Sequence, residues 1–155
     1  MPVQAFQRLE EIVRILRSER GCPWDQKQTA ASLKKYLLEE AAELAEAIDQ
    51  GDPALICEEA GDLHFVLALL LAICEEQGGC SAAAALNAAC EKMRRRHPHV
   101  FAADQETTLS EAQLREQWER IKQEEKKAKA QSLSVTELNR PPVSFKIPEG
   151  KEGND

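Results

Sequence analysis

The chain has 155 residues, of which 43% are hydrophobic, and it carries a formal net charge of −7. This length is enough for one compact domain with its own apolar core and a tail, without disulfide or metal staples. The negative charge disfavours a surface that binds nucleic acid or an anionic membrane, because phosphate polymers are repelled, but it allows small phosphorylated ligands that arrive with a cation.

Ala, Leu, Glu, Gln, Lys and Arg dominate the chain while β-branched and aromatic residues are sparse, which favours helix over strand. We therefore expect an all-α helical bundle of about five helices. The N-terminus lacks the pattern of a signal peptide, and the apolar run from Leu63 to Cys74 is too short to span a membrane. Five cysteines without a CxxC pair indicate free thiols in a reducing compartment, so we expect a cytoplasmic protein.

The first predicted helix covers residues 3–18, where apolar residues recur with a period near 3.6. Gly21, Cys22 and Pro23 interrupt this pattern and predict a loop. Either Thr29 or Ser32 can cap a second helix, which should end near Asp49.

The Asp52–Pro53 pair predicts the start of a third helix, because Asp accepts hydrogen bonds from free amides and Pro suits the first helical position. This helix should run to about residue 77, and a fourth should follow from Ser81 to near residue 96. The SEAQ segment at 110–113 has the form of a capping box and predicts a fifth helix. We expect one domain over residues 1–130 and a loosely held, or partner-bound, tail over residues 131–155.

Two pairs of carboxylates interrupt the apolar stripes of the second and third predicted helices. Glu40 and Glu43 are three residues apart and so lie on one helix face, and Glu59 and Asp62 repeat that spacing. Glu40 stands in a stripe with four apolar residues, Leu33, Leu37, Leu44 and Ile48. Taken alone, each acidic helix could simply present good surface helix formers. Because both pairs share the spacing and the placement, we favour a functional role.

The short connection between these helices predicts antiparallel neighbours, which would bring the two pairs together. Two like charges about 4 Å apart repel by about 4 kcal/mol at an effective dielectric of about 20. The carboxylates are therefore apart and solvated, or partly protonated, or gathered around a divalent cation. Oxygen ligands suit Mg²⁺ or Mn²⁺, and four of them suggest more than one ion, loaded with a phosphorylated substrate.

Five segments together carry a resemblance to a known family. They are EEAAE at 39–43, EAGD at 59–62, GCPWDQKQT at 21–29, SLKKYLLEEAAE at 32–43 and EKMRRRHPHVF at 91–101. EEAAE is the end of SLKKYLLEEAAE, and in their order along the chain these segments resemble the MazG-type all-α nucleoside triphosphate pyrophosphohydrolases, over roughly residues 5–125. The chain has one MazG copy, whereas long members have two, and its tail matches nothing in that pattern.

The resemblance implies a dimerising α-helical bundle in which Glu40, Glu43, Glu59 and Asp62 hold Mg²⁺. It also implies hydrolysis of a nucleoside triphosphate to the monophosphate and pyrophosphate. We expect a homodimer or higher homo-oligomer and, from the negative charge and the short apolar run, no nucleic-acid or membrane partner. Lys92, Arg95 and Arg96 would meet the phosphates, and Trp118 would contact the base. From its position beside the ligand pair, Glu39 is our candidate for orienting or deprotonating the attacking water.

Several of these residues also have a purely structural interpretation. Arg95 and Arg96 could stabilise a helix C-terminus through its dipole, and Trp118 could be a core residue. We expect Trp24 to anchor its loop in the core and His64 to be a buried, hydrogen-bonded histidine. The segment 124–127 (EEKK) is expected to be a solvated face.

The preferred function is Mg²⁺-dependent hydrolysis of NTPs or dNTPs, with Mn²⁺ as a possible substitute, in the removal of unwanted nucleotides from the pool. One rival is a sibling enzyme with a narrower substrate, such as dUTP, dCTP or phosphoribosyl-ATP. A rival of another class is a metal- or nucleotide-binding interaction module without turnover. The sequence contains no glycine-rich phosphate loop, Ser-His-Asp set or reactive Cys-His motif that would compete for the chemistry.

Overall fold

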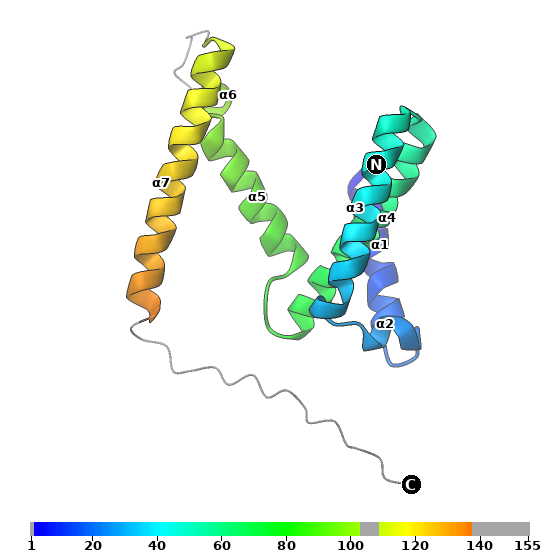
Figure 1. Ribbon diagram of the computed structural model, residues 1–155. Helices are drawn as coiled ribbons and strands as arrows, with labels where there is room; N and C mark the ends of the chain where they lie inside the picture. The colour runs from blue at the N-terminus through cyan, green and yellow to red at the C-terminus, as the bar shows by residue number, and fades with distance from the viewer. Residues whose placement is uncertain (1, 103–108, 138–155) are drawn as a thin grey trace. The chain divides into compact units, whose positions relative to one another are not determined.

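The computed structural model describes residues 2–102 and 109–137, and all regular structure in these ranges is helical (Figure 1). The helices are α1 (Pro2–Arg17), α2 (Pro23–Lys27), α3 (Ala30–Gln50), α4 (Pro53–Glu76), α5 (Ala82–Arg96), α6 (Pro98–Phe101) and α7 (Glu111–Glu137). The predicted all-α class is therefore confirmed. The chain divides into two compact units, Met1–Cys90 and Glu91–Asp155, with the boundary inside α5.

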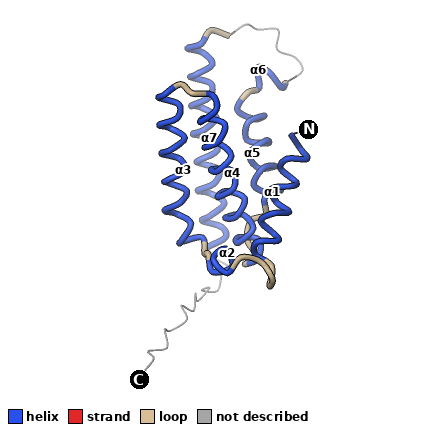
Figure 2. The backbone as a smooth tube through the Cα atoms, turned by 90° about the vertical axis from the view of Figure 1, so that its right-hand side faces the viewer, coloured by secondary structure: helices blue, strands red, loops and turns tan. Residues whose placement is uncertain are grey.

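In the first unit, α4 is the central helix. It packs along α3 on one side and α1 on another, and α2 contacts α1 (Figure 2). The core where these helices meet consists of Val13, Leu33, Leu69 and Ile73, each 1% exposed. Tyr36 and Phe65 are among the partly buried residues that pack against it. This core fixes α3 against α4, the two helices that carry the acidic pairs.

The start of α3 is set by a reciprocal capping box. The backbone amide of Ser32 donates to Thr29 Oγ1 at 3.1 Å, and the amide of Thr29 donates to Ser32 Oγ at 2.9 Å. Thr29 is the N-cap, so the two residues that the sequence offered as alternatives act together. At the other end Gly51 has a φ of 68°, a left-handed conformation that costs glycine nothing because it lacks a Cβ.

A connection of only two residues, Gly51 and Asp52, joins α3 to α4. Asp52 Oδ1 accepts a hydrogen bond from the backbone amide of Ala54 at 2.8 Å, and Pro53 occupies the first turn. A connection this short makes the two helices antiparallel neighbours, as predicted. The acidic pairs therefore lie on directly adjacent helices.

Arg17 at the end of α1 ties three helices together. Its Nε and Nη2 donate to the two carboxylate oxygens of Glu76 on α4 at 2.7 and 2.6 Å, and its Nη1 donates to the carbonyl of Asp25 on α2. The hydrogen bonds and charge of Arg17 lower the pKa of Glu76. Asp25 itself is 5% exposed. At Gly21, between α1 and α2, a Cβ would lie 2.2 Å from the carbonyl oxygen of Leu16, so this close approach requires glycine.

Replacing Glu76 with Gln should lower the free energy of unfolding by about 1 kcal/mol, a modest figure because the Glu76 side chain is half exposed. A lowered pKa means that the folded state binds fewer protons, so this contribution is present above the ordinary carboxyl pKa. It is lost as the pH falls through the lowered value. Urea titrations of both proteins at several pH values measure the difference.

The neighbouring Glu75→Gln variant is the matched control, because Glu75 is an exposed glutamate that makes the same change of charge. We expect its stability to differ little from the parent chain at any pH. A difference between Glu76→Gln and the parent that persists unchanged into strong acid would contradict the ion-pair origin of the effect.

Three structural expectations for the first unit were wrong. Residues 23–27 form the short helix α2 instead of a loop, because Pro23 starts a turn that Asp25 and Gln28 close through a backbone hydrogen bond. Trp24 is 47% exposed, and its ring meets the ring of Tyr36 edge-on at 5.3 Å instead of entering the core. His64 is exposed instead of buried, although its Nδ1 forms the expected hydrogen bond, to the carbonyl of Ala60, and its ring centroid lies 5.5 Å from that of Phe6.

The second unit contains the end of α5, the short helix α6 and α7. The predicted capping box at the start of α7 is present: the amide of Ser110 donates to Gln113 Oε1 at 2.9 Å, and the amide of Gln113 donates back to Ser110 Oγ at 3.4 Å. Helix α7 continues to Glu137, beyond the predicted domain end at residue 130. The rest of the predicted tail lies outside the described residues, and the 130/131 boundary stays a prediction.

Among the described residues, none of the helices is long and apolar enough to cross a membrane. The run from Leu63 to Cys74 instead forms the part of α4 that contributes Leu69 and Ile73 to the core.

Candidate functional site

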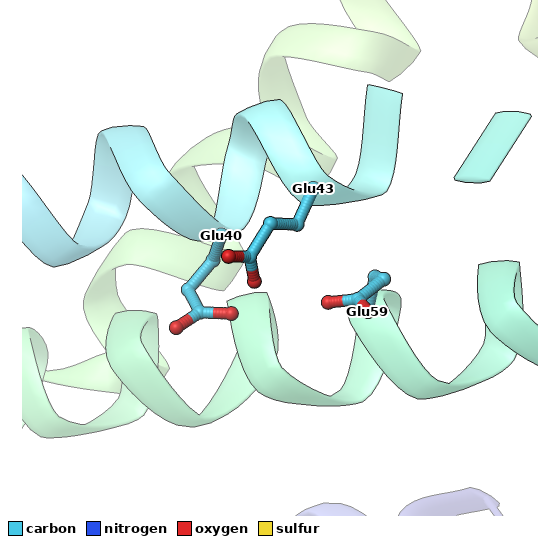
Figure 3. Close-up of side chains that lie close together, drawn as sticks. All are labelled: Glu40, Glu43 and Glu59. Atoms are coloured by element: carbon cyan, nitrogen blue, oxygen red, sulfur yellow. The ribbon is translucent and has the colours of Figure 1, made fainter. Parts of the chain in front are cut away.

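Three carboxylates from two helices converge at one point in the first unit. Glu40 and Glu43 project from α3 and Glu59 from α4, and one oxygen of each lies within 4.8 Å of the others (Figure 3). Glu40 and Glu59 are half-buried and Glu43 is exposed. The side chains of one acidic pair thus meet a member of the other, as the antiparallel arrangement predicted.

The electrostatics show that this grouping is unfavourable without a counter-charge. Desolvation raises the pKa of Glu40, and the charges of Glu43, Asp62 and Glu59 raise it further. Desolvation also raises the pKa of Glu59, followed by the charges of Glu43 and Asp62. In the part of the chain that the structure describes, every charged neighbour that shifts the pKa of Glu40 or Glu59 is acidic. Such a donor set of clustered carboxylate oxygens fits a hard divalent cation.

Asp62, the fourth predicted ligand, lies near the group without joining it. Its charge acts on both Glu40 and Glu59, but its carboxylate is outside the set of three. Aspartate is one methylene shorter than glutamate, which reduces its reach from the same helix face. Glu39 is exposed, and its charge also contributes to the raised pKa of Glu40. It therefore flanks the group, as expected from its position on α3.

The basic residues of the predicted phosphate site lie in the second unit, at the end of α5. Lys92 is half-buried there. Arg95 and Arg96 both form ion pairs with Glu125 of α7, at 3.1 and 2.8 Å. The expectation that segment 124–127 is a solvated face was therefore wrong at Glu125, whose side chain is only 19% exposed. A signal was available, since Glu125 follows Trp118 by seven residues and so shares its helix face.

Trp118, the predicted base-contacting residue, is half-buried inside the second unit. The guanidinium of Arg96 lies 5.1 Å from its ring centroid, and the His97 ring meets it edge-on at 5.0 Å. His97 and His99 also pack together, with ring centroids 5.7 Å apart. These contacts place Trp118 at the centre of a small aromatic and cationic cluster.

Comparisons with known proteins identify the family of this chain. Residues 28–101 match the family model described as the MazG nucleotide pyrophosphohydrolase domain, a range that contains all the predicted site residues except Trp118. The crystal structure of a MazG-related protein from Thermotoga maritima superposes with a TM-score of 0.63 and is 32% identical in sequence. The match covers 76% of this chain and 98% of that one. This chain belongs to the MazG family.

Two curated relatives are similar in sequence to the MazG chain. It is 40% identical to "Nucleoside triphosphate pyrophosphohydrolase/pyrophosphatase MazG" of Thermotoga maritima and 39% identical to "Nucleoside triphosphate pyrophosphohydrolase" of Escherichia coli K12. Each match covers 86% of this chain and 50% of the relative. The MazG chain thus spans about half the length of these curated relatives.

Proposed function

We propose that this chain hydrolyses nucleoside triphosphates to nucleoside monophosphates and pyrophosphate with the help of Mg²⁺, for which Mn²⁺ could substitute. The observation that carries the proposal is the convergence of Glu40, Glu43 and Glu59 from two helices in a chain of the MazG family. The names of its two relatives, both nucleoside triphosphate pyrophosphohydrolases, support the same chemistry.

The proposed ligands are Glu40, Glu43, Glu59 and Asp62. The raised pKa values of Glu40 and Glu59 support this assignment, because repulsion among the carboxylates is the feature that a cation would relieve. Bound Mg²⁺ would supply neutralisation of the triphosphate charge and activation of water. The half-burial of Glu40 and Glu59 limits their motion, so the donor oxygens are held in place before substrate arrives.

In the proposed reaction, water attacks the α-phosphorus and the bond to the β-phosphate oxygen breaks, so that pyrophosphate leaves. Glu39 is the proposed acceptor of the proton from water, since it is exposed and lies beside the ligand group. We further propose that Lys92, Arg95 and Arg96 bind phosphate oxygens, for which guanidinium groups are suited. Base contact by Trp118 would have to use the part of its ring that Arg96 and His97 leave free.

We also propose an oligomeric state, a location and a cellular role for this chain. Four large apolar side chains of α1 are exposed, Val3, Phe6, Ile12 and Ile15, and they support a homodimer in which a second copy covers them. Five free cysteines support a cytoplasmic location. Within that location we propose a role in removing unwanted nucleotides from the pool.

The test is to incubate the purified chain with Mg²⁺ and each nucleoside triphosphate, each deoxynucleoside triphosphate or phosphoribosyl-ATP in turn, and to measure pyrophosphate. We expect release of pyrophosphate with Mg²⁺, and loss of this release when a chelator removes the metal. Release from dUTP, dCTP or phosphoribosyl-ATP alone would favour the narrower sibling activity. Nucleotide binding without pyrophosphate under either Mg²⁺ or Mn²⁺ would favour the interaction module and reject turnover.

A further inference from the structure

One glutamate in the second unit binds both arginines at the end of α5. Glu125 Oε1 accepts hydrogen bonds from Nε and Nη2 of Arg95 at 3.3 and 3.1 Å. Its other oxygen, Oε2, accepts from Nε and Nη2 of Arg96 at 3.1 and 2.8 Å. Each guanidinium thus presents the same edge to one oxygen of a single carboxylate. The arrangement is a fork in which Glu125 sets the orientation of two cations at once.

The two arms of this fork differ in exposure. Arg96 is 18% exposed and lies over the Trp118 ring, so its position is fixed from two directions. Arg95 is 56% exposed, and its two hydrogen bonds to Glu125 orient its guanidinium on the solvent side. Arg96 is therefore the more buried and more restrained of the two arginines, and Arg95 is the more exposed. Both turn the same Nε–Nη2 edge toward Glu125.

The charges explain why a carboxylate is needed at this position. Arg95 and Arg96 are consecutive cations, and Lys92 precedes Arg96 by one helical turn. Repulsion among them would spread two long side chains over many rotamers, and Glu125 offsets that repulsion. The hydrogen bonds of Arg96 and Arg95 also lower the pKa of Glu125, so it stays ionised. Two guanidiniums on one carboxylate leave a net positive charge for an anionic ligand.

We propose that Glu125 is a positioning residue of the phosphate site, one that orients Arg95 and Arg96 so that their remaining N–H groups meet the oxygens of a polyphosphate. The inference rests on the proposed function, in which these arginines bind the triphosphate. Both guanidiniums use their Nε–Nη2 edge for Glu125, and within residues 2–102 and 109–137 their Nη1 groups have no hydrogen-bond partner, so these can meet a second acceptor. Glu125 itself does not touch the substrate.

The experiment compares Glu125→Gln with Glu124→Gln, which makes the same change of charge one residue away at an exposed position. Pyrophosphate release is measured against nucleotide concentration, and inorganic triphosphate is used as a competing ligand that has no base. We expect Glu125→Gln to raise both KM and the inhibition constant for triphosphate by about tenfold, with kcat changed less than about threefold. Glu124→Gln should leave all three constants within about twofold of the parent.

A second variant, Glu125→Asp, keeps the charge but shortens the side chain so that it cannot reach both arginines. Glu125→Asp should raise KM and the inhibition constant for triphosphate by less than Glu125→Gln does. If Glu125→Gln fails to fold, Glu125→Asp is the variant that tests the inference. Unchanged constants in a folded variant would show that Glu125 only joins α5 to α7. A lower KM would show that Glu125 competes with phosphate. Either result overturns the inference.

Arg95→Ala and Arg96→Ala separate this inference from the proposal on which it rests. If neither variant raises the inhibition constant for triphosphate, the arginines do not bind phosphate and that part of the proposed function fails. If they raise it and Glu125→Gln does not, the phosphate site stands and the positioning role of Glu125 is rejected.

Discussion

Glu40→Gln should reduce kcat for pyrophosphate release by at least about a hundredfold, or about 2.7 kcal/mol of activation free energy. Glutamine has nearly the same shape but no charge, so the metal would lose a ligand whose oxygen lies within 4.8 Å of those of Glu43 and Glu59. Without metal, the same variant should be more stable than the parent, because the charge that Glu43, Asp62 and Glu59 repel is gone. Steady-state kinetics and thermal unfolding in a chelator measure the two effects.

Glu46→Gln is the matched control, because Glu46 is an exposed glutamate of α3 that lies outside the group of three. Its kcat should stay within about twofold of the parent. Adding Mg²⁺ should raise the unfolding temperature of the parent and of Glu46→Gln more than that of Glu40→Gln, since at a given concentration a ligand stabilises the folded state more the more tightly it binds. A Glu40→Gln protein that turns over normally, or that loses its helical circular dichroism, would reject the metal-ligand role.

Leu33→Ala should lower the free energy of unfolding by about 2–5 kcal/mol, the range for removing a large side chain from a packed core. Leu33 is 1% exposed and packs with Val13, Leu69 and Ile73 where α1, α3 and α4 meet. A loss of this size is a large part of the roughly 5–15 kcal/mol that stabilises a typical domain. Urea unfolding followed by far-ultraviolet circular dichroism measures it.

The matched control is Leu38→Ala, the same substitution on the same helix at a position that is 61% exposed. It deletes the same atoms without leaving a buried cavity, so its effect should be much smaller. Equal losses in the two variants would contradict the location of the core on the Leu33 face of α3.

Much of the first unit was predictable because its helix ends are determined by local chemistry. Thr29 and Ser32 cap α3, and Asp52 with Pro53 starts α4, through hydrogen bonds within a few residues in the sequence. The convergence of the acidic pairs followed from those boundaries, since a two-residue connection leaves the helices little choice but to pack side by side. The approach of Glu59 to Glu40 and Glu43 needed no further information.

The features that escaped prediction depend on contacts between residues far apart in the sequence. Trp24 was expected in the core because large aromatic residues are usually buried, but Asp25 is the buried residue of α2 and Trp24 points outward to Tyr36. Glu125 was assigned to a solvated face because EEKK is a common surface composition. The seven-residue spacing from Trp118 indicates the helix face of Glu125, but its partners on α5 lie about thirty residues earlier, and no local pattern identifies them.

The length of the short connection between α3 and α4 determines which residues of the two helices lie opposite each other in the acidic group. Glu43 and Glu59 are each eight residues from Gly51, on opposite sides, and Glu40 and Asp62 are each eleven residues from it. In an antiparallel hairpin of helices, residues equidistant from the turn face one another at the same height. One added residue at the turn would shift one helix by about 1.5 Å and about 100° against its partner. The geometry of the acidic group therefore depends as much on the length of this turn as on the carboxylates themselves.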